Sequence, residues 1–221
     1  MTEKIVSLDI ETENTGTDIK DGNKRIISIQ IYNDKIEEIY YDDSNDKNIQ
    51  KGKERIKSLL DDGYIFVGYN LINFDVPLIK KFLDIEIPFS SIIEIIEMNK
   101  IVELRKNLKK YKLEDVCNEL GVECSHKKLL IPLTEQHKKD RDVIEGAKIE
   151  GAKTASIKGW SLEFCRKRAL DLISGGLAIL DAYNQFVRSD GNPDSIFYKY
   201  AIGDVRTEYN MYHKLKTMNY H

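Results

Sequence analysis

The sequence predicts an α/β fold in which helices flank one mixed central sheet. Short apolar runs rich in β-branched residues, typical of buried strands, are confined to the first third of the 221-residue chain. Segments whose apolar residues recur at helical spacing alternate with these runs and then dominate the second half. Hydrophobic residues make up 41% of the chain and charged residues 32%, as in ordinary globular proteins with a sizeable core.

Strands and helices are expected to alternate over the first 90 residues. The run KIVSL, leading into Asp9, predicts a buried strand. The segment RIISIQIYNDKIEEIYY predicts a hairpin, because Asn33 and Asp34 tolerate the backbone angles of a tight turn. A helix is expected in IQKGKERIKSLLDD, and a strand in YIFVG that ends at Gly68. The next helix, FDVPLIKKFL, has Pro77 in its first turn, where a missing N–H is tolerated.

Helices are expected throughout the second half. The segment LEDVCNELG has an apolar stripe, and Gly121 is placed to cap its end. The echo EGAKIEGAK, residues 145–153, is interpreted as either a mobile loop or a frayed helix. The stretch SLEFCRKRALDLISGGLAILDAYNQFV predicts two helices that are split near Gly175 and Gly176. A last helix is expected after Pro193.

Charge and cysteine content restrict the function classes. The formal net charge of −3 argues against a protein that coats long DNA, but not against one that grips a few nucleotides. Three cysteines without a C-x-x-C pair favour free thiols in a reducing compartment, so we expect a cytoplasmic protein. The N-terminus reaches charged residues too early for a signal peptide, and no apolar run is long enough to span a membrane.

The tetrapeptide Leu-Asp-Ile-Glu occurs twice, at residues 8–11 and 83–86. An isolated D-x-E is most often a pair of solvated carboxylates. In the first copy, however, Asp9 and Glu11 end a buried strand, whose period of two directs both side chains to one face. Unpaired charge is unfavourable there, and a bound metal ion would compensate it. The second copy ends a helix and precedes a proline, so its carboxylates are expected to face water.

Two further carboxylates follow predicted elements. Asp75 lies in GYNLINFD at the start of a helix, and Asp204 lies in YKYAIGD on the last helix. Tyr200 is four positions before Asp204, so the two share a helix face. Ordinary alternatives are an N-cap for Asp75, half-buried packing for Tyr200 and a surface ion pair for Asp204. If the acids cluster, we expect that neutralising Asp204 raises stability in metal-free buffer by relieving repulsion.

These motifs, in this order, resemble the three exonuclease motifs of the DEDD superfamily. They are Asp9-Ile-Glu11, Tyr69-Asn70-Leu-Ile-Asn-Phe74-Asp75 and Tyr200-Ala-Ile-Gly-Asp204. The third motif contains tyrosine in place of histidine, and in this it resembles the DEDDy branch of the superfamily. LDIET and GYNLINFD most resemble the proofreading exonuclease domain of family B DNA polymerases, and YKLEDVCNELG resembles the helix that follows there.

The resemblance implies a ribonuclease H-like fold, with a mixed central sheet flanked by helices and a helical insertion before the last helix. We expect no polymerase domain to follow, so the chain is similar to a free-standing nuclease. We therefore expect a single exonuclease domain over residues 1–221, in which residues 129–192 form an extended or inserted segment.

The chemistry implied by the resemblance is two-metal hydrolysis of phosphodiester bonds with Mg²⁺ or Mn²⁺. Asp9 would bridge both ions, Glu11 and Asp204 would complete the site of the attacking water, and Asp75 would hold the second ion through water. Tyr200 would orient the nucleophile, since a phenol with a pKa of about 10 is a poor base at neutral pH. The product would be nucleoside 5′-monophosphates from the 3′ end of DNA, single-stranded by preference.

Contacts with the nucleic acid are implied for Thr12, Asn70 and Phe74. By resemblance, Asn70 would hydrogen-bond a terminal nucleotide, Phe74 would make an apolar contact and Thr12 would approach the terminal base. A turn asparagine and a core phenylalanine are the ordinary alternatives.

A basic run in the C-terminal half of the chain contains Arg166 and Arg168, and Trp160 and Phe164 precede it closely. Aromatic side chains next to cations suit stacking and phosphate contact with single strands, although charge runs are more often a solvated face. The four histidines show no metal-ligand spacing and are expected to be structural or exposed.

Two other functions remain open at this point. The DEDDy arrangement also resembles ribonuclease D-type enzymes, so the substrate could be the 3′ end of RNA. A non-catalytic nucleic-acid-binding subunit of the same fold is the other alternative, although such proteins typically lack some of the acids. A second copy of the chain or a repair or replication protein is a possible partner.

Overall fold

The computed structural model describes residues 4–13, 25–43, 47–107 and 113–218, and its chain forms two compact units. The first unit comprises Met1–Thr12, Ile26–Lys127 and Tyr198–His221, and the second comprises Glu13–Arg25 and Lys128–Phe197. The second unit thus takes in the segment 129–192 that we expected to be extended or inserted. That a single exonuclease domain spans residues 1–221 stays a prediction.

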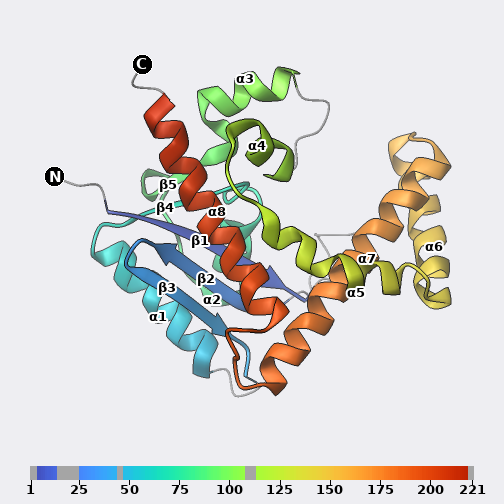
Figure 1. Cartoon of the computed structure of the whole chain (residues 1–221), viewed down its shortest axis with the longest axis horizontal. Helices are drawn as coiled ribbons and strands as arrows, with labels where there is room; N and C mark the ends of the chain where they lie inside the picture. Colours follow the sequence, from blue (N-terminus) through green and yellow to red (C-terminus); the bar gives the residue numbers. More distant parts are fainter. Residues whose placement is uncertain (1–3, 14–24, 44–46, 108–112, 219–221) are drawn as a thin grey trace. The chain divides into compact units, whose positions relative to one another are not determined.

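The first unit is built on a mixed five-stranded sheet in the order β3-β2-β1-β4-β5 (Figure 1). The central strand β1 pairs antiparallel with β2 and parallel with β4, while β3 is antiparallel to β2 and β5 is parallel to β4. The mixed sheet and the predicted hairpin are confirmed. The strands are β1 Ile5–Thr12, β2 Ile26–Asn33, β3 Ile36–Tyr41, β4 Ile65–Gly68 and β5 Ile92–Glu94.

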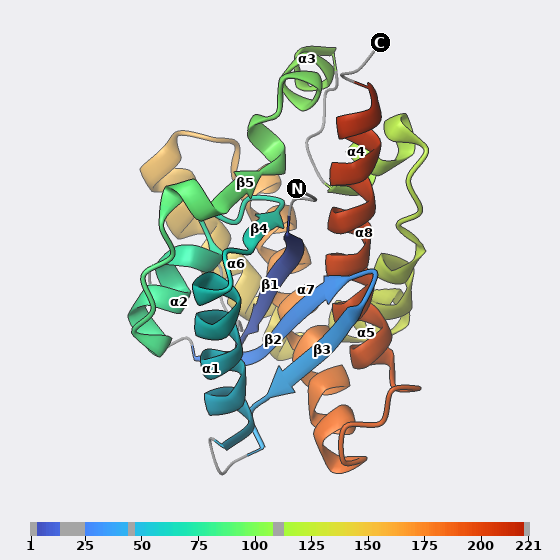
Figure 2. The same ribbon diagram turned by 90° about the vertical axis from the view of Figure 1, so that its left-hand side faces the viewer.

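Helices cover both faces of this sheet. Helices α1 and α2 lie on one face and α8 on the other (Figure 2). The helices of this unit are α1 Lys47–Asp61, α2 Asp75–Leu83, α3 Asn99–Asn107, α4 Leu113–Leu120 and α8 Ile196–Met218, with 3-10 turns η1 Phe89–Ser91, η2 Ile95–Glu97 and η3 Ser125–Leu130. Gly121 ends α4 at φ +65°, as predicted for a capping glycine.

The two sides of β1 have different neighbours. Val6, Leu8 and Ile10 are buried in the core that the sheet forms with α1 and α2. The alternate residues point the other way, since the hydroxyl of Ser7 donates a 3.0 Å hydrogen bond to Glu208 of α8. Alternation along β1 therefore places Asp9 and Glu11 on the α8 side as well.

The second unit is helical and contains α5 Ile131–His137, α6 Arg141–Lys158 and α7 Leu162–Arg188. Helices α6 and α7 pack side by side through a thin core of Val143, Ala147, Ala169 and Ile173 (Figure 1). The contact is close, because a Cβ on Gly151 would lie 2.6 Å from the Cα of Arg166.

Two predictions about these helices are wrong. The predicted break at Gly175 and Gly176 does not exist, because α7 runs through both glycines. The echo at residues 145–153 is neither a loop nor a frayed end, since it lies inside α6.

No helix in the described part of the chain is long and apolar enough to cross a membrane.

Candidate functional site

Three carboxylates from opposite ends of the chain meet beside the sheet. Asp9 and Glu11 of β1 face α8, and the ligand oxygens of these two residues and of Asp204 on α8 all lie within 4.8 Å of one another. Oxygens on opposite sides of one bound cation are about 4–5 Å apart, because each bond to Mg²⁺ or Ca²⁺ is about 2.0–2.6 Å. The spacing and the all-oxygen donor set fit a hard divalent cation such as Mg²⁺ or Mn²⁺.

Asp75, the first residue of α2, joins this cluster. Its Oδ1 accepts the backbone N–H of Ile10 at 3.1 Å, and its side chain hydrogen-bonds that of Asp9. The alternative that Asp75 caps the helix is wrong, because the cap position is Phe74 and no side chain caps this end. Asp75 is only 4% exposed, so its carboxyl is committed to the acid cluster.

Tyr200 lies one turn before Asp204 on α8 and is buried. Its hydroxyl hydrogen-bonds the carboxylate of Glu11 and lies 3.4 Å from Nζ of Lys127. Burial, together with Glu11 and Asp204, raises the pKa of Tyr200 well above 10. The phenol therefore keeps its proton at neutral pH, which suits a donor that orients a group better than a base.

Burial makes the full charge of this cluster unfavourable. Burial and the neighbouring Asp204 raise the pKa of Asp9 from 3.8 to about 7. Burial and the charge on Asp9 likewise raise the pKa values of Glu11 and Asp75 well above their ordinary range. A bound cation would remove this penalty, because opposite charge favours the ionised form.

Asp204 differs from the other acids because the ammonium of Lys127 and the imidazole of His126 already contact it. Nζ of Lys127 lies 2.5 Å from Oδ1 and 2.6 Å from Oδ2 of Asp204, and Nε2 of His126 lies 2.9 Å from Oδ1. Burial by itself raises the pKa of Asp204. Lys127 and His126 lower this pKa by more than burial raises it, so the pKa of Asp204 lies below its ordinary value. The expectation that the histidines are structural or exposed fits His126, whose largely buried imidazole hydrogen-bonds Asp204. The surface ion pair considered for Asp204 is wrong, since its side chain is 5% exposed.

A glycine in α8 admits these partners. His126 and Lys127 lie on the 3-10 turn η3, and a Cβ on Gly203 would lie only 2.4 Å from Cγ of His126. Because Gly203 has no side chain, the imidazole packs directly on α8 beside Asp204. The signal that could have found this contact is a glycine inside a helix, next to a predicted metal ligand.

A further buried acid, Glu208, was also missed. It accepts the hydroxyl of Ser7 at 3.0 Å and the backbone N–H of Tyr69 at 3.1 Å. Burial, then Asp9 and Asp204, raise its pKa well above 4.5. The spacing of Tyr200, Asp204 and Glu208 at every fourth residue places all three on one helix face and could have indicated it.

The residues predicted to contact nucleic acid in the first unit lie at two places. Thr12 is buried at the end of β1, where the pairing with β2 is irregular after Glu11. Asn70 and Phe74 lie on the turn that leads from β4 into α2. Asn70 has a φ of +71°, and Phe74 is partly exposed and packs on the core.

Glu94, at the end of β5, holds that turn in place. Its buried carboxylate accepts the backbone N–H of Asn70 at 2.6 Å and of Ile72 at 2.9 Å. This buried acceptor fixes the turn that immediately precedes Asp75. Nothing in the sequence motifs singled it out.

We expect Glu94→Ala to lower the free energy of unfolding by about 3 kcal/mol, because two backbone N–H groups lose a charged acceptor. Glu94→Gln retains one acceptor oxygen and should lose about half as much. Equilibrium denaturation with urea measures both. Glu97→Ala on the exposed side of η2 is the matched control, and an equal loss in that variant would contradict the role of Glu94.

Arg166 and Arg168 belong to the second unit, where both are exposed on α7. The aromatic neighbours Trp160 and Phe164 are exposed too, at 48% and 52%. Their rings meet edge to face, with the ring centres 5.7 Å apart.

The second copy of the tetrapeptide, residues 83–86, behaves as predicted, since both of its carboxylates are exposed.

Comparison with known proteins supports the architecture. A family model described as RNase_H superfamily matches residues 6–132, more than half of the chain. The match includes Asp9, Glu11 and Asp75 but ends before Tyr200 and Asp204, which join the site through the geometry described above. A search of curated proteins found no match. With its mixed sheet, flanking helices and acid cluster beside the central strand, the chain belongs to the ribonuclease H superfamily.

Proposed function

We propose that this protein is a metal-dependent 3′–5′ exonuclease that hydrolyses DNA, preferably single-stranded, and releases nucleoside 5′-monophosphates. Membership of the ribonuclease H superfamily suggests a nuclease-like function. The observation that carries the proposal is the convergence of Asp9, Glu11 and Asp204, with the Tyr200 hydroxyl bonded to Glu11. Two divalent cations, Mg²⁺ or Mn²⁺, are the proposed cofactors, and the cytoplasm is the proposed location.

The residues divide the work as follows. Asp9, Glu11 and Asp204 would hold one cation directly, and Asp75 would support a second. When bound in such sites, divalent cations polarise the phosphodiester and lower the pKa of a water molecule. Tyr200, whose raised pKa keeps it protonated, donates a hydrogen bond that orients the reacting groups. Partial burial of the cluster strengthens each of these electrostatic contacts.

The test is a degradation assay on 5′-labelled single-stranded DNA with Mn²⁺, Mg²⁺ or a chelator. We expect a ladder that shortens from the 3′ end only when a cation is present, with nucleoside 5′-monophosphates as products. Internal cutting of the DNA, or degradation from the 5′ end, would refute the exonuclease proposal. The same assay on RNA of identical sequence decides the polymer, and faster loss of RNA would favour the exoribonuclease. Binding of 3′ ends without any product would favour a non-catalytic subunit.

Positions around the acid cluster are proposed to hold the terminal nucleotides. The Asn70 side chain and the partly exposed ring of Phe74 precede Asp75 on the turn fixed by Glu94. Thr12 follows Glu11 directly on β1. Each of the three either follows a carboxylate of the cluster directly in sequence or lies on the turn that leads to one. This closeness supports contact with the end of a bound strand.

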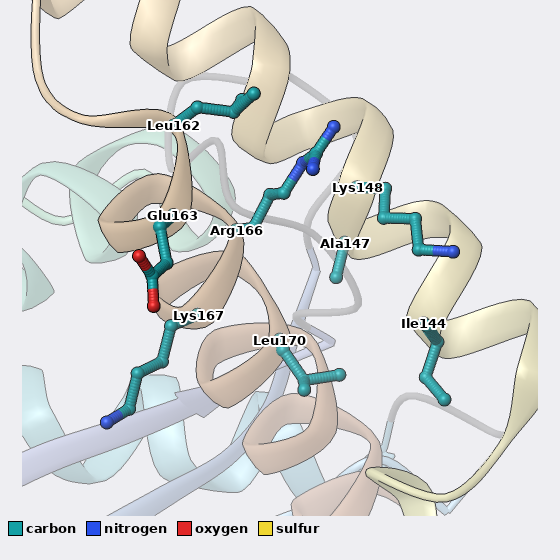
Figure 3. A pocket seen from close by; sticks show the side chains of 8 residues that line it. All are labelled: Ile144, Ala147, Lys148, Leu162, Glu163, Arg166, Lys167 and Leu170. Carbon is teal, nitrogen blue, oxygen red and sulfur yellow. The ribbon is translucent and has the colours of Figure 1, made fainter.

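A second surface, on α6 and α7 of the second unit, is proposed to hold single-stranded nucleic acid. Residues 148–168 carry six Lys or Arg and two Glu in a chain whose net charge is −3. Arg166 and Lys148 border a pocket of about 550 Å³ with an apolar floor that includes Leu170 (Figure 3). Arg168 and Trp160 line a separate pocket of about 410 Å³ on the same two helices. Cations beside apolar and aromatic side chains suit phosphates and stacked bases.

We expect the double variant Arg166→Gln/Arg168→Gln to weaken binding of a single-stranded DNA oligonucleotide. The slope of log affinity against log salt concentration should become shallower by about 1.4, because each phosphate contact on a single strand contributes about 0.7. Fluorescence anisotropy at several salt concentrations measures this. Arg188→Gln, at the other end of the same helix, is the control and should leave the slope unchanged. An unchanged slope in the double variant would exclude this surface.

A further inference from the structure

Lys127 stands among the acids in a position where its charge matters. Its Nζ contacts both carboxylate oxygens of Asp204, at 2.5 and 2.6 Å, and lies 4.8 Å from the centre of the Tyr200 ring. The side chain is 24% exposed, so the ammonium is largely enclosed but retains a path to solvent. Asp9 and Glu11 also act on this ammonium, and with Asp204 they raise the pKa of Lys127 despite its burial.

The Asp204 carboxylate would face two positive partners at once. It is one of the three residues whose oxygens fit a divalent cation, and Lys127 already contacts both of its oxygens. Two positive charges close together in a partly buried site repel strongly. The ammonium and a divalent cation are therefore competing occupants of Asp204.

We propose that Lys127 is a resident counter-cation, which holds the acid cluster together without metal and whose charge weakens the binding of a divalent cation at Asp204. This inference rests on the proposed function only through metal binding, and not on hydrolysis. Lys127 is in these terms a positioning residue: it acts through Asp204, and its exposed fraction gives it room to move.

The test compares Lys127→Met with Lys128→Met. Methionine has nearly the length of lysine and no charge, and Lys128 is the adjacent lysine, exposed to solvent. In chelator, Lys127→Met should melt at a lower temperature than the unsubstituted protein. By titration calorimetry it should bind Mn²⁺ about tenfold more tightly, equivalent to about 1.4 kcal/mol. Lys128→Met should change neither quantity, and Lys127→Arg, which keeps the charge, should not gain Mn²⁺ affinity.

The two readouts separate this proposal from its alternatives. A lysine that only supports the fold would lower both the melting temperature and the Mn²⁺ affinity when replaced, and that result overturns the proposal. Unchanged values for both overturn it too. If Lys127→Met folds only when Mn²⁺ is added, the cation has replaced the ammonium and the proposal is supported; a variant unfolded with and without Mn²⁺ refutes it. Failure of the unsubstituted protein to degrade DNA would refute the proposed function, while the melting and Mn²⁺ measurements would still decide the role of Lys127.

Discussion

Asp9→Asn is expected to lower the rate of DNA hydrolysis about a thousandfold while raising the stability of the metal-free protein. The carboxylate of Asp9 is the one that faces Glu11, Asp75 and Asp204 together. Loss of a ligand to the proposed cations removes several kcal/mol of transition-state stabilisation, and each 1.4 kcal/mol corresponds to tenfold in rate. Asparagine keeps the size of the side chain, so the fold should survive.

The gain in stability should depend on pH. The pKa of Asp9 is raised from 3.8 to about 7, so the native protein binds a proton between these values that the unfolded chain releases. In chelator, this group therefore lowers stability progressively as pH rises from about 4 to about 7. Asp9→Asn removes that loss, and we expect a gain on the order of 3 kcal/mol at pH 8 that disappears near pH 4.

Asp84→Asn is the matched control, because the second Leu-Asp-Ile-Glu copy presents the same residue to solvent. It should leave both hydrolysis and the pH profile of unfolding unchanged. Single-turnover kinetics and urea denaturation from pH 4 to pH 8 provide the two measurements. Near-normal hydrolysis by Asp9→Asn would remove Asp9 from the reaction.

Asp204→Asn is expected to have the opposite effect on stability. Its neutralisation leaves Lys127 and His126 without their shared carboxylate, and breaking a buried ion pair from one side typically costs about 3 kcal/mol or more. We expect a loss of about 3 kcal/mol in chelator at pH 7. This reverses the expectation from the sequence that neutralising Asp204 relieves repulsion.

The pH dependence of this loss has a defined sign. The pKa of Asp204 is lowered in the native state, so its contribution to stability is present above the ordinary value of 3.8 and is lost as pH falls below it. The loss caused by Asp204→Asn should therefore diminish in acid. In a Lys127→Met background it should be smaller at every pH, which a double-mutant cycle can measure. A higher melting temperature for Asp204→Asn than for the unsubstituted protein would show that repulsion outweighs the pair.

Local patterns predicted the strands β1 to β4 and the shared face of Asp9 and Glu11 correctly, but not β5. The apolar run before Asp9 and its alternation were enough to predict β1 and the shared face of Asp9 and Glu11. They failed for α7, where Ile173 and Ala178 are buried on either side of Gly175 and Gly176. Each glycine weakens a helix by only about 1 kcal/mol, which tertiary packing of the flanking residues exceeds.

The echo in α6 illustrates the same limit. Its repeat of five residues is out of phase with the helix, so the buried stripe is Val143, Ala147 and Gly151 at every fourth residue. The repeat itself carries no helical period, and the segment is helical because the small residues of this stripe pack closely against α7.

By itself, the sequence determined which acids share a face and in which order they follow along the chain, because strand and helix periods are local properties. Only the tertiary structure decided which charges and donors surround each acid. Lys127 is 77 residues from Asp204 in sequence yet contacts its carboxylate, and Glu208 and Glu94 gained their buried partners in the same way. The ionisation of a buried group depends on the charges and donors that the fold places around it, and no local spacing encodes these.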